Sequence, residues 1–167
     1  MKNRKSARER ICRTQESKVT PIPATMIRRW GRGLMLVPAP LEIEALIREI
    51  PKGLVVSVRE IRKELARRHG ADVTCPLVTE LFWRIIAEAA VEEETDGCSD
   101  ITPYWRVVKD DGSLNERLPG GVRIQVGKLV QEGHLLLRAQ HTQRIRVPYE
   151  SELRPPLWLK ASGFAHS

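Results

Sequence analysis

The strongest constraint on the fold is a pair of helices that the sequence delimits within residues 57–94. Ser57 and Glu60 have the spacing of a capping box, in which the serine hydroxyl accepts from the third helical N–H and the glutamate reaches back. Gly70 is placed to end this helix in a left-handed conformation. Pro76 suits the first position of the second helix, which is predicted to run to residue 94. Two helices joined by so short a turn permit a helix-turn-helix, although many helical hairpins bind no nucleic acid.

Each of the two helices has a predicted buried face and a charged face. In the first, an apolar stripe of Val58, Ile61 and Leu65 is surrounded by basic residues, namely Arg59, Arg62, Lys63, Arg67 and Arg68. This basic face either is solvated or contacts phosphates. In the second, a wide apolar face is predicted from Leu77, Val78, Leu81, Phe82, Ile85, Ile86 and Ala89, opposite a charge ladder of Glu80, Arg84 and Glu88.

The remaining elements are predicted to be short. Apolar spacing and flanking prolines indicate a helix over 41–50 and a helical turn over 24–30. Strands are expected at 35–37, 54–56 and 104–108, a helix at 122–132, and a hairpin with strands near 134–138 and 143–147. Residues 1–20 show no apolar periodicity and are predicted to be disordered, and the last twenty residues are predicted to be loop or tail.

Charge and cysteine content limit the partners and the class of protein. Residues 1–33 contain ten lysines and arginines against two glutamates, a balance of +8, so the rest of this +7 chain sums to −1. Such a segment attracts phosphate backbones, or serves only as a solvated tail. No apolar run approaches the roughly 18 residues of a membrane span. Cys12, Cys75 and Cys98 have no zinc-ligand spacing, so we expect no metal and no other cofactor.

Three segments in order resemble the DNA-binding domain of alkylguanine-DNA alkyltransferases. They are IPKGLVVSVREI, PYWRVVKDDGSLNERLPGG and QVGKLVQEGH, and the resemblance covers about residues 41–137. It implies an α+β, mainly helical, winged-helix-like alkyltransferase DNA-binding domain, here with a short C-terminal hairpin. Enzymes of this family repair alkylated guanine by transferring the alkyl group once to a cysteine, with the flipped base held in a pocket.

The resemblance places Tyr104 where the family has its acceptor cysteine and Trp105 where it has the activating histidine. Pro103 and Arg106 match the family motif, and Glu132 matches its glutamate, which we expect to bond backbone groups across the pocket. A phenol has a pKa near 10 and is a poorer soft nucleophile than a thiolate. An indole has only an N–H donor and cannot accept a proton. Alkyl transfer at this site is therefore not expected, as in the non-catalytic, alkyltransferase-like branch, whose members bind alkylated bases without repairing them.

Two departures from the family pattern affect the predicted DNA contacts. Val58 stands where the family has a tyrosine that helps to rotate the nucleotide, and no residue clearly matches its intercalating arginine. Arg84 is the one arginine of the second helix, and Phe82 or Trp83 could wedge into the duplex instead. Tyr104 and Trp105 either stack on an extruded base or are core aromatics. The predicted DNA-binding residues are Ser57, Arg59, Arg62, Lys63, Phe82, Trp83, Arg84, Gly120 and Gly121, and the predicted base pocket is Pro103, Tyr104, Trp105, Arg106 and Glu132.

The sequence thus predicts a basic, partly disordered arm (1–37), an alkyltransferase-like DNA-binding domain (38–137), and a C-terminal hairpin and tail (138–167). We expect a cytoplasmic, monomeric, non-enzymatic protein that binds duplex DNA at alkylated or damaged guanine, with repair proteins as further partners and no membrane association. The alternatives are a winged-helix regulator on the same scaffold, an alkyltransferase that uses Cys98 or Cys75, and a protein-interaction module without DNA affinity.

Overall fold

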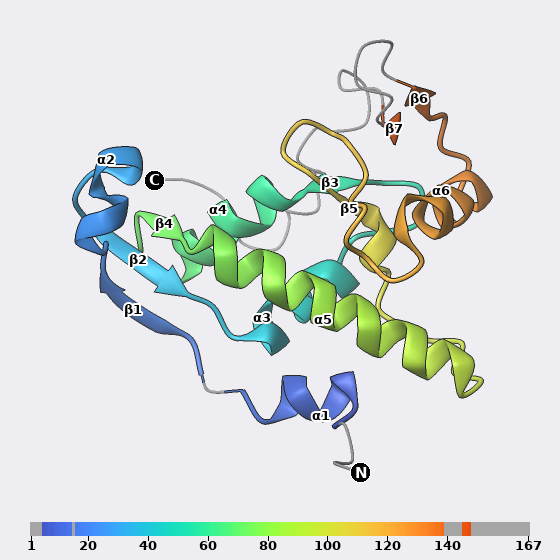
Figure 1. Ribbon diagram of the computed structural model, residues 1–167, viewed down its shortest axis with the longest axis horizontal. Coiled ribbons are helices and arrows are strands. Elements are labelled where there is room, and N and C mark those ends of the chain that lie inside the picture. Colours follow the sequence, from blue (N-terminus) through green and yellow to red (C-terminus); the bar gives the residue numbers. More distant parts are fainter. Residues whose placement is uncertain (1–4, 15, 139–144, 148–167) are drawn as a thin grey trace. The chain divides into compact units, whose positions relative to one another are not determined.

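A computed structural model describes residues 5–14, 16–138 and 145–147 (Figure 1). The chain forms two compact units, and each is built from two stretches of sequence. The first contains Met1–Glu49 and Ile61–Tyr104, and the second contains Ile50–Glu60 and Trp105–Ser167. Both helices and short strands are present, which confirms the predicted α+β class. In the described part of the chain, no helix is both long enough and apolar enough to cross a membrane.

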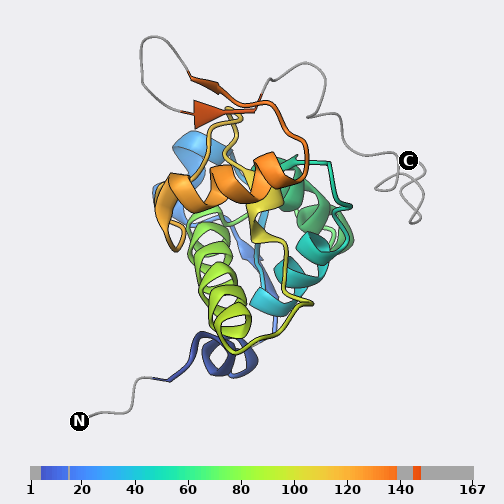
Figure 2. The ribbon, with the colours of Figure 1, turned by 90° about the vertical axis from the view of Figure 1, so that its right-hand side faces the viewer.

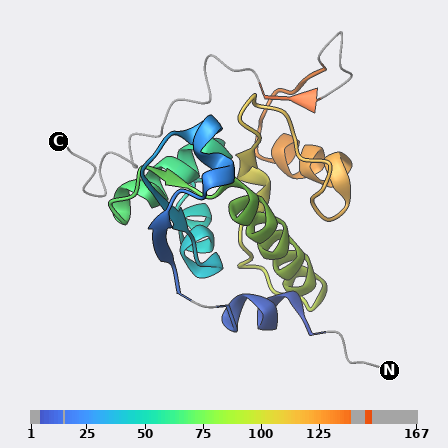
Figure 3. The same cartoon turned by 60° about the vertical axis from the view of Figure 1, so that its left-hand side comes forward.

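A three-stranded sheet in the first unit joins the N-terminal segment to the helical hairpin. Strand β2 (Leu34–Val37) is central; it pairs antiparallel with β1 (Lys18–Pro21) and parallel with β4 (Val73–Thr74). A 3₁₀ turn, η1 (Ala24–Met26), and a short helix, α2 (Ile27–Trp30), connect β1 to β2 (Figure 3). The helical turn and the central strand were predicted, whereas β1 and β4 were not. Strand β1 has four residues and β4 has two. The partner of β4, strand β2, also lies far from it along the chain.

The helices of this unit follow the predicted start and stop signals closely. They are α3 (Pro40–Arg48), α4 (Val58–Arg68), whose first residues belong to the second unit, and α5 (Pro76–Thr95). The Ser57 hydroxyl accepts from the Glu60 N–H at 3.3 Å, and Gly70 has a φ of +63°. Ile43, Leu46 and Ile47 of α3 are buried. These helices therefore begin and end where capping chemistry predicts.

The expected disorder of residues 1–20 is wrong for the described part of that segment, although residues 1–4 and 15 lie outside it. Helix α1 (Ala7–Cys12) is capped by Ser6 and packs against α5, with Ala7 and Ile11 buried (Figure 2). Arg8 forms ion pairs of 2.7 Å with Glu44 and 2.6 Å with Glu93. These carboxylates lie far along the chain, so a search for local periodicity cannot detect them.

The predicted faces of α5 are also partly wrong. Leu77 and Leu81 were assigned to the apolar face but are 69% and 41% exposed, while Trp83 is only 1% exposed. The charge ladder does not form as predicted, because Glu88 pairs with Arg10 of α1 at 2.8 Å. Burial on α5 is set by the neighbouring helices α1 and α3, which the helix's own sequence does not show.

The second unit contains a two-stranded parallel sheet, a helix and a hairpin. Strand β3 (Val56–Ser57) pairs with β5 (Val107–Val108). Before β5, the residues Tyr104–Arg106 form a 3₁₀ turn, η2, instead of the predicted continuation of the strand. Helix α6 (Gly121–Gln131) agrees with prediction, as does the C-terminal hairpin, in which β6 (Leu137–Arg138) pairs antiparallel with β7 (Ile145–Arg146). The predicted tail at 148–167 lies outside the described residues.

Candidate nucleic-acid interface

Glu132 is the hub of the residues matched to the family motif in the second unit. It follows α6 as the C-cap, with a side chain that is 7% exposed. One of its oxygens accepts from Trp105 Nε1 at 2.9 Å and from an Arg106 terminal nitrogen at 2.8 Å. Its other oxygen accepts from the Gly53 N–H at 3.3 Å. The expected bond to a backbone group is therefore present, but the shorter bonds come from the two motif side chains.

Arg106 completes this cluster by bonding the backbone beyond α3. Its second terminal nitrogen donates to the Ile50 carbonyl at 2.5 Å, and its Nε lies 3.1 Å from both Glu132 oxygens. Burial raises the pKa of Glu132. The bonds from Arg106, Trp105 and the Gly53 N–H lower the pKa by more than burial raises it, so the net pKa lies below its usual value. The carboxylate is thus held ionised, and it fixes both side chains of the motif.

Two cations lie against the Trp105 ring. Lys128 Nζ is 5.0 Å and Arg106 Cζ is 5.8 Å from the ring centroid, within the range of cation–π attraction. The indole is 8% exposed. The Trp105 side chain is therefore fixed by the hydrogen bond from its N–H to Glu132 and by the two cations against its ring. Little of its surface is accessible in this conformation.

Tyr104 is fully buried, at 0% exposure, and Pro103 is buried beside it in sequence. The Tyr104 carbonyl accepts from Trp83 Nε1 at 3.3 Å. Burial, with a smaller contribution from the negative charge of Glu94, raises the pKa of Tyr104 to about 12. The phenol is therefore protonated near neutral pH. Its predicted role as a stacking surface for a base stays a prediction, and it requires the ring to become accessible.

The role of Trp83 as a wedge, which the sequence suggested as one possibility, stays a prediction and conflicts with its burial in this conformation. Its side chain is 1% exposed and its N–H is bonded within the first unit, so inserting it into a duplex would empty the core of that unit. Phe82 and Arg84, which precede and follow Trp83 in α5, are half-buried. Arg84 makes no ion pair with any residue that the structure describes. The first half of α5 thus presents the exposed side chains of Leu77 and Leu81 together with one cation, Arg84, and one carboxylate, Glu80.

The predicted basic face of α4 is partly neutralised by the protein itself. Arg67 and Arg68 both bond Glu64, and Arg59 lies 3.6 Å from Asp110. Arg62 is half-buried and Lys63 is exposed. Ser57 is buried and serves as the helix cap, so its predicted DNA contact competes with a structural role.

Gly120 and Gly121 form the turn into α6, with φ values of +74° and +64°. A Cβ on Gly120 would lie 2.2 Å from Ile124 Cγ1, so the turn itself requires glycine there. Sequence reasoning missed Gln125, which is 0% exposed and donates to the Trp105 and Val107 carbonyls at 3.2 and 2.9 Å. The sequence signal that could have identified Gln125 was a polar residue on the predicted buried side of the helix. Its two hydrogen bonds connect α6 to the backbone of the motif.

Comparison with known proteins gives a fold but no family. No family model matches the sequence, and no curated protein matches it. Two solved structures are similar: S. pombe Atl1 in complex with damaged DNA containing O6-carboxymethylguanine, and S. pombe ATL in complex with DNA. Each is 19% identical with a TM-score of 0.51, over 70% of this chain and 94% of the other. The chain therefore has the α+β fold of a protein that was solved bound to damaged DNA.

Proposed function

We propose that this protein is a non-enzymatic, alkyltransferase-like DNA-binding protein that recognises alkylated or damaged guanine without transferring the alkyl group. The observation that carries the proposal is the fold shared with S. pombe Atl1, which was solved with DNA containing O6-carboxymethylguanine. The order of the motif segments, with PYWR at residues 103–106, supports the same function. Duplex DNA is the proposed partner of a monomer, and repair proteins would act on the marked lesion.

The chemistry of the motif supports binding without transfer. Alkyl transfer needs a nucleophile that loses its proton and a base that takes it. Tyr104 is buried with its pKa raised to about 12, and the Trp105 N–H already donates to Glu132. Cys75 is buried in a small hydrophobic cluster, and Cys98 is exposed next to the end of α5. Neither cysteine belongs to the motif, so the proposal assigns no acceptor.

The test compares binding to two duplexes that are identical except for one O6-methylated guanine. We expect the protein to prefer the methylated duplex by tenfold or more, or about 1.4 kcal/mol, measured by fluorescence anisotropy. Trp105→Phe should reduce this preference, because it removes the indole N–H that Glu132 accepts. Trp83→Phe is the matched control, since it also removes one buried indole hydrogen bond, and it should keep the preference.

Equal affinity of the wild-type protein for both duplexes would contradict lesion recognition. Mass spectrometry of the cysteine peptides after incubation with the methylated duplex tests the second half of the proposal. We expect no peptide to gain a methyl group. A methylated Cys98 or Cys75 peptide would instead show that the protein is an alkyltransferase with an acceptor outside the motif.

A further inference from the structure

The basic residues of the N-terminal segment do not all share the same environment. Its first folded element, α1, uses Arg8 and Arg10 in ion pairs with Glu44, Glu93 and Glu88. These two cations hold the helix in place, so they are poorly available to an outside partner. The charges that remain available must lie elsewhere in the segment.

Three arginines on the connection between β1 and β2 have a different environment. Arg28, Arg29 and Arg32 are exposed, and none of them pairs with a carboxylate among the residues that the structure describes. Arg29 Cζ lies 5.4 Å from the centroid of the Trp30 ring, within cation–π distance. We call these three residues the arginine corner. Three positive charges within five residues repel one another, and none of them forms an ion pair with Asp72, the carboxylate that lies against Gly33.

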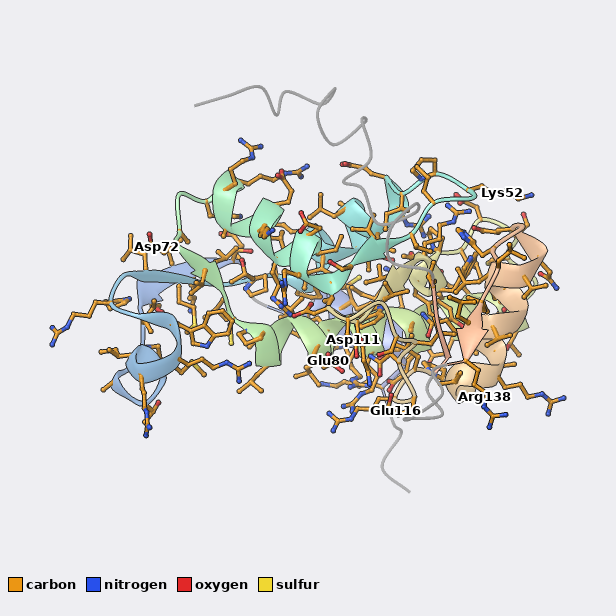
Figure 4. All side chains as sticks on the ribbon, turned by 90° about the horizontal axis from the view of Figure 1, so that it is seen from above. Lys52, Asp72, Glu80, Asp111, Glu116 and Arg138 are labelled. Atoms are coloured by element: carbon orange, nitrogen blue, oxygen red, sulfur yellow. The ribbon has the colours of Figure 1, made fainter. Side chains whose placement is uncertain are left out.

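The arginine corner is carried by a packed element. Met26, Ile27 and Trp30 pack against a small hydrophobic cluster of Ile22, Met35 and Cys75. The loop that follows is fastened by Asp72, whose carboxylate accepts from the Leu34 N–H at 2.7 Å (Figure 4). Gly33 is required there, since a Cβ would lie 2.4 Å from an Asp72 oxygen. The backbone that presents the three cations is therefore anchored before any ligand binds.

The same cluster connects the arginine corner to the start of α5. Val73 and Val78 pack against it, and Cys75, the residue before α5, is one of its members. The Cys75 N–H also donates to the Leu36 carbonyl at 2.8 Å. The arginine corner and the first half of α5 thus share one support within the first unit.

We propose that the arginine corner is a phosphate-contact site, which binds the backbone of duplex DNA beside the segment that α5 contacts. Guanidinium groups match phosphate oxygens in geometry as well as charge. Contacts of this kind position a protein on the duplex and carry no sequence information. This inference rests on the proposed DNA-binding function and adds a site that the α4–α5 hairpin does not supply.

The test removes the three charges and measures the salt dependence of DNA binding. The triple variant Arg28→Gln/Arg29→Gln/Arg32→Gln should make the salt dependence weaker. The negative slope of log affinity against log salt should become shallower by about 2–3, since each phosphate contact contributes roughly 0.9. Affinity near 0.1 M salt should fall roughly 10- to 100-fold, equally for methylated and unmodified duplexes. The matched control, Lys5→Gln/Arg13→Gln/Lys52→Gln, removes three exposed cations from other places and should change the slope far less (Lys52 is labelled in Figure 4).

The outcomes separate this site from the proposed function. An unchanged slope in the corner variant, or an equal loss in the control, overturns the site, even if the preference for methylated guanine persists. A reduced slope in a protein that never distinguished the two duplexes supports the site and contradicts lesion recognition. No salt-dependent binding by the wild-type protein overturns both. Thermal unfolding followed by circular dichroism should give the same Tm for all three proteins, because every substituted residue is exposed.

Discussion

Glu132→Gln should lower the free energy of unfolding by about 3 kcal/mol, the expected cost of leaving a buried charge without its partner. The Arg106 and Glu132 side chains are only 15% and 7% exposed, and their contact is 2.8 Å. The amide cannot balance the guanidinium charge, and its NH₂ group cannot accept the bonds that the Gly53 N–H and Arg106 Nε donate to the second carboxylate oxygen. Urea unfolding followed by fluorescence or circular dichroism measures the loss.

Glu116→Gln is the matched control, because it neutralises a glutamate whose ion pair with Lys109 is much more exposed. It should cost about 0–1 kcal/mol. The wild-type protein should also lose stability as the pH falls below about 4.3, the usual glutamate pKa, towards the lower pKa of folded Glu132. Glu132→Gln should lack this part of the pH dependence. Equal losses in the two variants would mean that Glu132 is solvated and does not organise the motif.

Arg8→Ala should destabilise the protein by about 2–3 kcal/mol, since it leaves the carboxylate of Glu44 buried without its main partner. Glu44 is 7% exposed, and it also accepts from the Thr102 hydroxyl at 2.6 Å. Burial raises the pKa of Glu44, but the bonds from Arg8 and Thr102 more than offset this and lower it overall. The Arg8 side chain is 32% exposed, so we expect less than the full cost of breaking a buried pair.

Arg10→Ala is a close control, because it makes the same substitution on the same helix. The Arg10–Glu88 pair is about one-third exposed on both sides, and its loss should cost about 0–1 kcal/mol. Chemical denaturation of both variants under the same conditions gives the comparison. If neither variant is destabilised, α1 is only loosely attached, as the sequence alone suggested.

Local chemistry predicted those elements whose boundaries are encoded by neighbouring residues. Ser57, Gly70 and Pro76 located α4 and the start of α5 because caps and proline act over a few residues. Helix α1 escaped prediction because it is only six residues long and depends on Glu44 and Glu93. Leu77 and Trp83 were assigned wrongly because other helices decide which side of α5 is covered.

One contact within the candidate site was predictable from the sequence, whereas its geometry was not. The resemblance grouped Arg106 with Glu132, and the structure brings them to 2.8 Å. It gave no indication that Trp105 would donate to the same carboxylate, or that Tyr104 would be completely buried. Side-chain hydrogen bonds of this kind depend on the 3₁₀ turn η2, where an extended strand had been predicted.

The division of the chain into interleaved units sets an order of events at the ribosome. All of the first unit lies before residue 105, so it can fold while the rest of the chain is still being made. Residues 50–60, by contrast, must wait for β5 before β3 has a partner. Val55 and Val56, which end up 1% and 2% exposed, are open to water during that interval. A nascent chain that has emerged from the ribosome only as far as about residue 104 would therefore carry a complete first unit with an unpaired apolar strand, which is the type of segment that chaperones bind.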